Sequence, residues 1–157
     1  MKISSPAFQG GGEIPVQYTC EGQNISPPLD WDMLPEGTRS LALLVDDPDV
    51  PTDQPFSHWV LYNIPIDWRG LPEDFQPSAD WAGERGRNSH GTTRYEGPCP
   101  PFGDPHHYYF RLYAVDDVLG MGEGATRAQV IDALQGHILE ETEIFGTYVR
   151  SEASLNP

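Results

Sequence analysis

The chain has 157 residues, with 24 acidic residues against 9 basic ones and a formal net charge of −15. A surface this acidic repels nucleic acids and anionic lipid surfaces, so the composition argues against both as partners. No apolar run reaches the roughly 18 residues that a membrane-spanning helix needs, so no transmembrane segment is predicted.

The expected architecture is mainly β, because the sixteen prolines and sixteen glycines favour many turns. Runs rich in β-branched, leucine and aromatic residues, bounded by proline or aspartate, predict the strands. In chain order these strands cover residues 14–20, 40–47, 57–64, 106–115 and 142–150. The length fits one domain, residues 1–157. The first residues lack the apolar stretch of a signal peptide, which predicts a cytoplasmic protein.

One helix is expected over residues 125–136, with Thr126 as its N-cap and Gly136 at its end. A second short helix is expected over residues 137–141. Residues 66–105 form a long irregular segment, and such segments in a compact domain are often functional.

The chain has two cysteines, Cys20 and Cys99, without the CxxC spacing of a zinc site. Two reduced, partly buried thiols are the expectation. A Cys20–Cys99 disulfide is the alternative, and it needs redox conditions that are rare in a mesophile cytosol.

Polar residues mark the ends of three expected strands. By strand alternation, His106 and Tyr108 head a face that continues as apolar residues, and His58 heads the face that it shares with Val60. Asp47 closes the strand over residues 40–47. If these ends converge, they form a small polar pocket. The alternatives are solvated histidines and an aspartate that only shapes a turn.

Several motifs, in order, resemble the phosphatidylethanolamine-binding protein family, also called the Raf kinase inhibitor-like family. They are "NISPPLDW" (24–31), "DDPDVP" (46–51), "SHWVLYNIP" (57–65), "GPCPP…HHYYFRLYAVD" (97–116) and "GHILEETEIFGTYVR" (136–150). The last motif is typical of the bacterial and archaeal branch. The resemblance implies a β-sandwich of Greek-key type with a few short peripheral helices.

The resemblance also implies a small pocket for phosphate or phosphorylated headgroup-type anions. Matched by motif, its ligand-binding residues are Asp47, Phe56, His58, Gly97, Pro98, His106 and Tyr108. It implies no cofactor and no catalytic residue.

The acidic residues near this pocket are expected to differ in role. Asp46 should face solvent, Asp47 should reach a histidine or the ligand, and Asp49 should accept backbone N–H groups in the turn. Asp104 would disfavour an anion if it faced the pocket.

The segment before the pocket carries residues that depart from the branch pattern, namely His90 and Arg94. Together with Arg85 and Arg87, Arg94 could supply a positive rim, or all three could be ordinary surface arginines.

The leading hypothesis is therefore a non-enzymatic protein that binds phosphate or a small phosphorylated ligand. The alternative is an inhibitor of a kinase or of a serine protease that acts through its loop surface. A hydrolase is less favoured because no nucleophile motif such as GxSxG is present. A metal site formed by Asp47, His58 and His106 is also less favoured. Related bacterial proteins suggest a homodimer.

Overall fold

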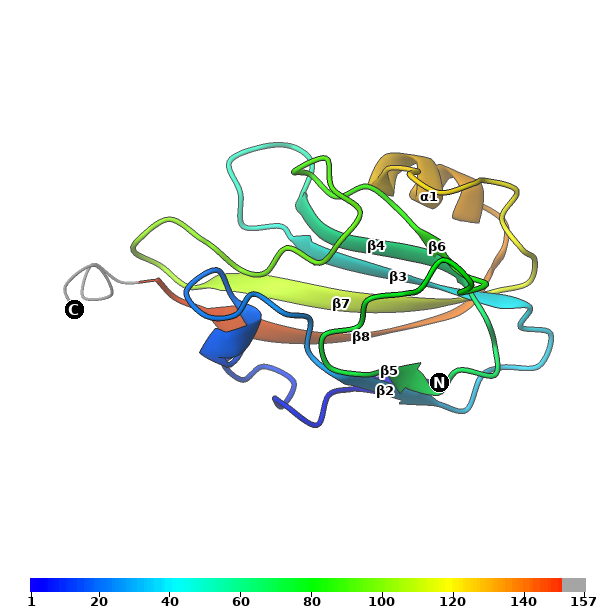
Figure 1. The fold of residues 1–157 in the computed structure, drawn as a ribbon, viewed down its shortest axis with the longest axis horizontal. Helices are drawn as coiled ribbons and strands as arrows, with labels where there is room; N and C mark the ends of the chain where they lie inside the picture. Colours follow the sequence, from blue (N-terminus) through cyan, green and yellow to red (C-terminus); the bar gives the residue numbers. More distant parts are fainter. Residues whose placement is uncertain (151–157) are drawn as a thin grey trace.

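The structure is a computed structural model, and it describes residues 1–150. Two antiparallel sheets pack face to face, and one helix covers the outer face of the larger sheet (Figure 1). The small sheet consists, in spatial order, of β1 (Lys2–Ser4), β2 (Leu29–Asp32) and β5 (Gly70–Leu71). The large sheet consists, in spatial order, of β6 (Glu84–Arg85), β4 (Phe56–Ile64), β3 (Ser40–Asp47), β7 (His106–Val115) and β8 (Ile138–Tyr148). The predicted mainly β fold is thus confirmed.

The three central strands match the sequence prediction almost residue for residue. Two predictions were wrong. Residues 14–20 contain the short 3-10 helix η1 (Val16–Tyr18) rather than a strand, because Pro15 precedes it and a Cys-Glu-Gly turn follows it. Residues 138–141 belong to β8, which pairs with β7 along the length of that strand, so they do not form the predicted helix.

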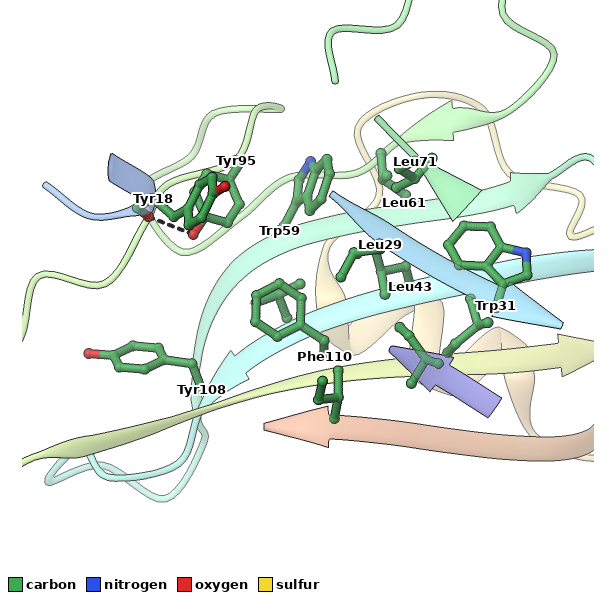
Figure 2. Close-up of a cluster of buried hydrophobic side chains, with 14 of the residues drawn as sticks. Tyr18, Leu29, Trp31, Leu43, Trp59, Leu61, Leu71, Tyr95, Tyr108 and Phe110 are labelled. Carbon is green, nitrogen blue, oxygen red and sulfur yellow. Dashed lines mark hydrogen bonds between the residues drawn. The ribbon is translucent and has the colours of Figure 1, made fainter. Parts of the chain in front are cut away.

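Two apolar layers hold the elements together. The layer between the sheets contains Trp59, Leu61, Phe110 and many smaller side chains (Figure 2). The second layer lies under helix α1 (Arg127–Leu134), which buries Val130 and Leu134 against the outer face of the large sheet. Both faces of the large sheet are therefore buried, which explains why β3 is buried at every position.

Helix α1 begins as the sequence predicts. The Thr126 hydroxyl accepts from the Gln129 backbone, and the Gln129 side chain accepts from the Thr126 backbone, so the two form a capping box. Among residues 1–150, no helix is long and apolar enough to cross a membrane.

A bulge in β4 changes which way its first residues point. Val45 of β3 lies opposite Trp59, but the next residue, Asp46, lies opposite Ser57, so His58 is the extra residue. Strand alternation predicted that His58 would share a face with Val60. That prediction was wrong, because Val60 packs under α1 while His58 lines a cavity at the other face.

Candidate functional site

A cavity of about 350 Å³ lies where β3 ends and where β4 and β7 begin. We refer to it as the histidine pocket. Six of the seven residues predicted to bind ligand line it: Asp47, Phe56, His58, Gly97, His106 and Tyr108. Because β3 is antiparallel to both of its neighbours, the end of β3 meets the starts of β4 and β7, which brings these side chains together.

His58 is buried, and its ring orientation is fixed by the backbone. Nδ1 lies 2.5 Å from the carbonyl oxygen of Glu96, which can only accept, so Nδ1 carries the hydrogen. Burial lowers the pKa of His58, although the Glu96 carbonyl and the Asp47 carboxylate oppose that shift. A neutral ring with its proton on Nδ1 presents Nε2 as a hydrogen-bond acceptor.

His106 is held by a carboxylate instead. Its Nδ1 lies 2.6 Å from Oδ2 of Asp47, which leaves Nε2 for the cavity. The other oxygen of Asp47 accepts the backbone N–H of Asp49 at 2.7 Å. Asp47 therefore orients the His106 ring, as predicted. It also closes the turn that follows β3, and that second role was predicted for Asp49.

Asp49 accepts a backbone N–H as predicted, but from β7 rather than from its own turn. Its Oδ2 accepts from the backbone nitrogen and the ring Nδ1 of His107 at 2.8 and 2.7 Å. Burial raises the pKa of Asp49, but the hydrogen bonds from His107 outweigh it and hold the pKa below its usual value.

Tyr108 lies at the inner end of the cavity with only 1% of its surface exposed. Its hydroxyl is buried and has no hydrogen-bond partner among residues 1–150. Figure 2 shows the hydroxyl pointing away from the core cluster around Phe110. Burial raises the pKa of Tyr108, and nearby Asp47 raises it further, so the hydroxyl stays protonated and can donate.

Aromatic rings form one side of the histidine pocket. The Phe56 ring centroid lies 4.8 Å from that of His58 and 5.0 Å from that of His90. The His58 ring in turn meets Tyr108 edge-on at 5.3 Å. His90 was noted in the sequence only as a departure from the branch pattern, and the structure adds it to the lining.

The wall opposite these rings is backbone. The amide of Gly97 donates to Oδ1 of Asn24 at 2.8 Å, and a Cβ at Gly97 would collide with the Tyr18 carbonyl oxygen. Glycine is thus required by close approach. Pro98, the seventh predicted residue, does not line the cavity; it is buried behind the wall, where its carbonyl accepts from Cys20 at 3.1 Å.

The rim of the pocket contains a disulfide between Cys20 and Cys99, whose Cα atoms lie 5.4 Å apart. The expectation of two reduced, partly buried thiols was therefore wrong, since both residues are also exposed. Their sequence separation of 79 hid their closeness in space. Arg150 lies beside the bridge, with Nη1 3.5 Å from Sγ of Cys99.

Of the two interpretations of Arg85, Arg87 and Arg94, a rim of the histidine pocket is not what the described residues form, since none of the three lines it. Arg85 pairs with Glu123, Arg94 pairs with Glu96, and Arg87 lies on the opposite face of the large sheet. Asp104 is exposed and does not line the cavity, so it does not oppose an anion there directly. No group of three or more metal-ligating side chains occurs within residues 1–150.

Asp46 was predicted to face solvent and is instead 1% exposed. It points to the helix side of the large sheet, where Oδ2 accepts from Nε of Arg127 at 2.9 Å. Arg111 lies 3.9 Å away. Burial raises the pKa of Asp46 despite the attraction of the two arginines.

Known proteins match nearly the whole chain. The family model for phosphatidylethanolamine-binding protein matches residues 4–149. A UPF0098 protein of Methanothermobacter thermautotrophicus is 47% identical over 153 residues, which cover 96% of this chain and 99% of the relative. A UPF0098 protein of Aquifex aeolicus is 43% identical over 153 residues, which cover 96% and 89%.

Two solved structures share the fold. The phosphatidylethanolamine-binding protein homologue CT736 of Chlamydia trachomatis superposes with a TM-score of 0.87 at 40% identity, covering 96% of this chain and 97% of its own. Escherichia coli YbcL, described as a member of the mammalian family, has a TM-score of 0.87 at 32% identity and covers 96% and 98%.

Proposed function

The chain belongs to the phosphatidylethanolamine-binding protein family, and from that premise we propose that its histidine pocket binds phosphate or the phosphoryl group of a small ligand without turning it over. The cavity of about 350 Å³ has room for such a group and for part of what it is attached to.

The observation that carries the proposal is the hydroxyl of Tyr108. A buried hydroxyl without a partner costs roughly 1–3 kcal/mol of stability, so native structures rarely keep one without a reason. This hydroxyl belongs to a side chain that lines the cavity, where a ligand oxygen would accept its hydrogen bond.

His58 and Tyr108 together define which hydrogen-bonding groups the ligand must offer. His58 presents an acceptor at Nε2, so a group that donates a hydrogen bond suits it. Tyr108 presents a donor. A phosphomonoester monoanion provides both functions at once, because it carries a P–OH hydrogen and unprotonated oxygens. The carboxylates of Asp47 and Glu96 beside the cavity also favour a ligand with one negative charge over a dianion.

We propose a binding role rather than catalysis because no activated nucleophile lies beside the Tyr108 hydroxyl or beside the rings of His58 and His106. The two pocket cysteines are joined in the disulfide, and no serine lines the cavity within the described chain. The His106–Asp47 pair could still act as a general base, so turnover deserves a direct assay.

A thermal-shift screen of the purified protein tests the proposal. Inorganic phosphate, phosphoethanolamine and phosphotyrosine should each raise the melting temperature with increasing concentration, whereas ethanolamine and tyrosine should not. A melting temperature that responds to none of the phosphorylated compounds contradicts the proposal. Phosphate release from phosphoethanolamine that disappears in His106→Gln would contradict the non-enzymatic part alone.

A further inference from the structure

A second cavity lies on the other face of the large sheet, and the histidine pocket does not include it. Its volume is about 270 Å³, and it lies between the start of β4, the segment around Arg87 and the first residues of α1. We refer to it as the arginine pocket. Its lining includes Ser57, Arg87, Ser89, Thr126, Arg127 and Ala128.

The N-terminus of α1 opens onto this cavity. The capping box uses the backbone nitrogens of Thr126 and Gln129, and the parallel bridge between Arg87 and Thr126 directs that of Arg127 toward the Arg87 carbonyl, so the nitrogen of Ala128 remains as a free donor. Helices usually place acidic residues in the first turn, but α1 has none there and begins with an arginine. The local sequence therefore leaves the positive end of the helix without a negative charge.

Ser57 gives an independent sign of a missing ligand. The residue is 3% exposed, and its hydroxyl is buried without a hydrogen-bond partner in residues 1–150. Its backbone is fully engaged, since the nitrogen donates to Oγ of Ser89 at 2.7 Å and the oxygen accepts from the Ser89 nitrogen at 2.9 Å. The side chain is thus held in place at the cavity wall.

The charges around the arginine pocket are positive on balance. No carboxylate lines it, whereas Asp47 and Glu96 line the histidine pocket. Arg127 gives Nε to Asp46, which leaves its two terminal nitrogens for the cavity. Arg87 is fixed by Nη1, which donates to the Gly91 carbonyl at 2.9 Å. Two guanidinium groups, those of Arg127 and Arg111, thus lie beside the single carboxylate of Asp46, and Arg87 adds a third positive charge to the pocket lining.

We infer that the arginine pocket is a second binding site, for a small tetrahedral oxyanion such as phosphate or sulfate. Its oxygens would accept from the two guanidinium groups, from the free N–H group of Ala128 at the helix N-terminus and from the Ser57 hydroxyl. The anion would also bridge α1 to β4. This site does not depend on the proposed function of the histidine pocket, because the two cavities share no lining residue.

Site-resolved nuclear magnetic resonance of the whole protein tests this inference. In a titration with sodium sulfate at constant ionic strength, the amide signals of Arg127 and Ala128 should shift and saturate. Arg87→Gln should weaken this binding at least tenfold, and Ser57→Ala should weaken it several-fold, with the fold unchanged. Arg85→Gln is the matched control, because it removes the same charge from an arginine outside the pocket. It should leave the affinity within twofold.

Three outcomes would overturn the inference. The first is no saturable shift at Arg127 and Ala128. The second is an equal loss of affinity in Arg87→Gln and Arg85→Gln, which would show general charge screening. The third is a saturable shift confined to histidine-pocket amides such as Gly97. Arg127→Lys keeps a charge near Asp46, so it provides a further variant if Arg87→Gln fails to fold; it should lower the affinity while retaining a native spectrum.

Discussion

Asp46 and Asp47 are neighbours in β3, and their carboxylates lie on opposite faces of the large sheet, each hydrogen-bonded to a different kind of side chain. Asp46 accepts from Arg127 of α1 at 2.9 Å, and Asp47 accepts from the ring of His106 at 2.6 Å. One side of this dipeptide therefore organises the arginine pocket and the other organises the histidine pocket. This arrangement explains why two adjacent buried carboxylates are tolerated: each accepts a hydrogen bond from its own partner on its own side of the sheet.

The first prediction concerns the unpartnered hydroxyl of Tyr108. Tyr108→Phe should leave the free energy of unfolding unchanged or raise it by up to about 1 kcal/mol, because the change removes a buried polar group that lacks a partner. The same change should weaken phosphate binding about tenfold, since a hydrogen bond to an anion is lost. Urea unfolding and calorimetric titration measure the two effects.

Tyr95→Phe is the matched control for that variant. Tyr95 is also buried, but its hydroxyl donates to the Tyr18 carbonyl at 2.7 Å, as the dashed line in Figure 2 shows. This variant should lose about 1 kcal/mol of stability and keep its phosphate affinity. If Tyr108→Phe is destabilised as much as Tyr95→Phe, the Tyr108 hydroxyl has a partner in solution and does not mark a ligand site.

The second prediction concerns the buried pair of Asp46 and Arg127. Arg127→Met should cost roughly 2–4 kcal/mol at pH 7, because it leaves the carboxylate of Asp46 buried with only Arg111 nearby at 3.9 Å. Burial raises the pKa of Asp46, so protonation should relieve this cost as the pH falls, at a pH above the usual range of an aspartate. Urea unfolding of the wild type and the variant at several pH values measures the difference.

The double variant Asp46→Asn/Arg127→Met separates charge from packing. It should recover most of the stability lost in Arg127→Met, since no uncompensated carboxylate remains. The contrary outcome is that the double variant loses as much free energy of unfolding as Asp46→Asn and Arg127→Met lose together. In that case the pair contributes through packing of the arginine stem rather than through its charge.

The sequence predicted the central strands well, because each is a long apolar or aromatic run between proline or aspartate clusters. It missed β1, β2, β5 and β6, whose two to four residues carry little pattern of their own and depend on long-range pairing. It assigned a helix to residues 137–141, where pairing with β7 outweighs the helix propensity of the glutamates.

The strand ends already pointed to Asp47, His58, His106 and Tyr108, and the motif resemblance added Phe56, Gly97 and Pro98. Alternation predicts the orientations of His106 and Tyr108 correctly, but it fails at His58, because a bulge has no signature in the residues 57–59 themselves. The lining by Asn24, His90 and Glu96 comes from loops, which no periodicity describes. The disulfide depends on a contact between residues 79 apart, which only the folded chain reveals.

The third prediction is that reduction destabilises the protein. The disulfide closes a loop with a sequence separation of 79, for which chain entropy gives a stabilisation of about 4–5 kcal/mol. Dithiothreitol should therefore lower the melting temperature of the wild type by many degrees. The Cys20→Ser/Cys99→Ser variant should melt near the reduced wild type and should not respond to the reductant. Equal melting temperatures with and without reductant would show that the thiols are free, as the prediction of a cytoplasmic protein would favour.

The fourth prediction follows from the lowered pKa of His58. Burial is the main cause of the shift, so the unfolded chain binds a proton at His58 more readily than the native protein does. The contribution of His58 to the free energy of unfolding should therefore be fully present above about pH 6.5. Below that value the free energy of unfolding should fall by at most about 1.4 kcal/mol per pH unit. In His58→Gln this part of the slope should vanish. Identical slopes in the two proteins between pH 5 and 7 would place the titration elsewhere.

The last prediction is the pH dependence of ligand binding in the histidine pocket. Because His58 is neutral and holds its proton on Nδ1, its Nε2 needs a donor from the ligand. The second pKa of a phosphomonoester is about 6, so its P–OH population rises as the pH falls from 7.5 to 5.5. The affinity for phosphoethanolamine should rise over the same range.

Sulfate, which has no proton to donate there, should bind this pocket weakly and without that rise. Calorimetry in an Arg87→Gln background, which weakens the second site, should show the contrast. Equal affinities for the two anions, with the same pH profile, would mean that His58 does not accept from the ligand and that Tyr108 and His106 bind it alone.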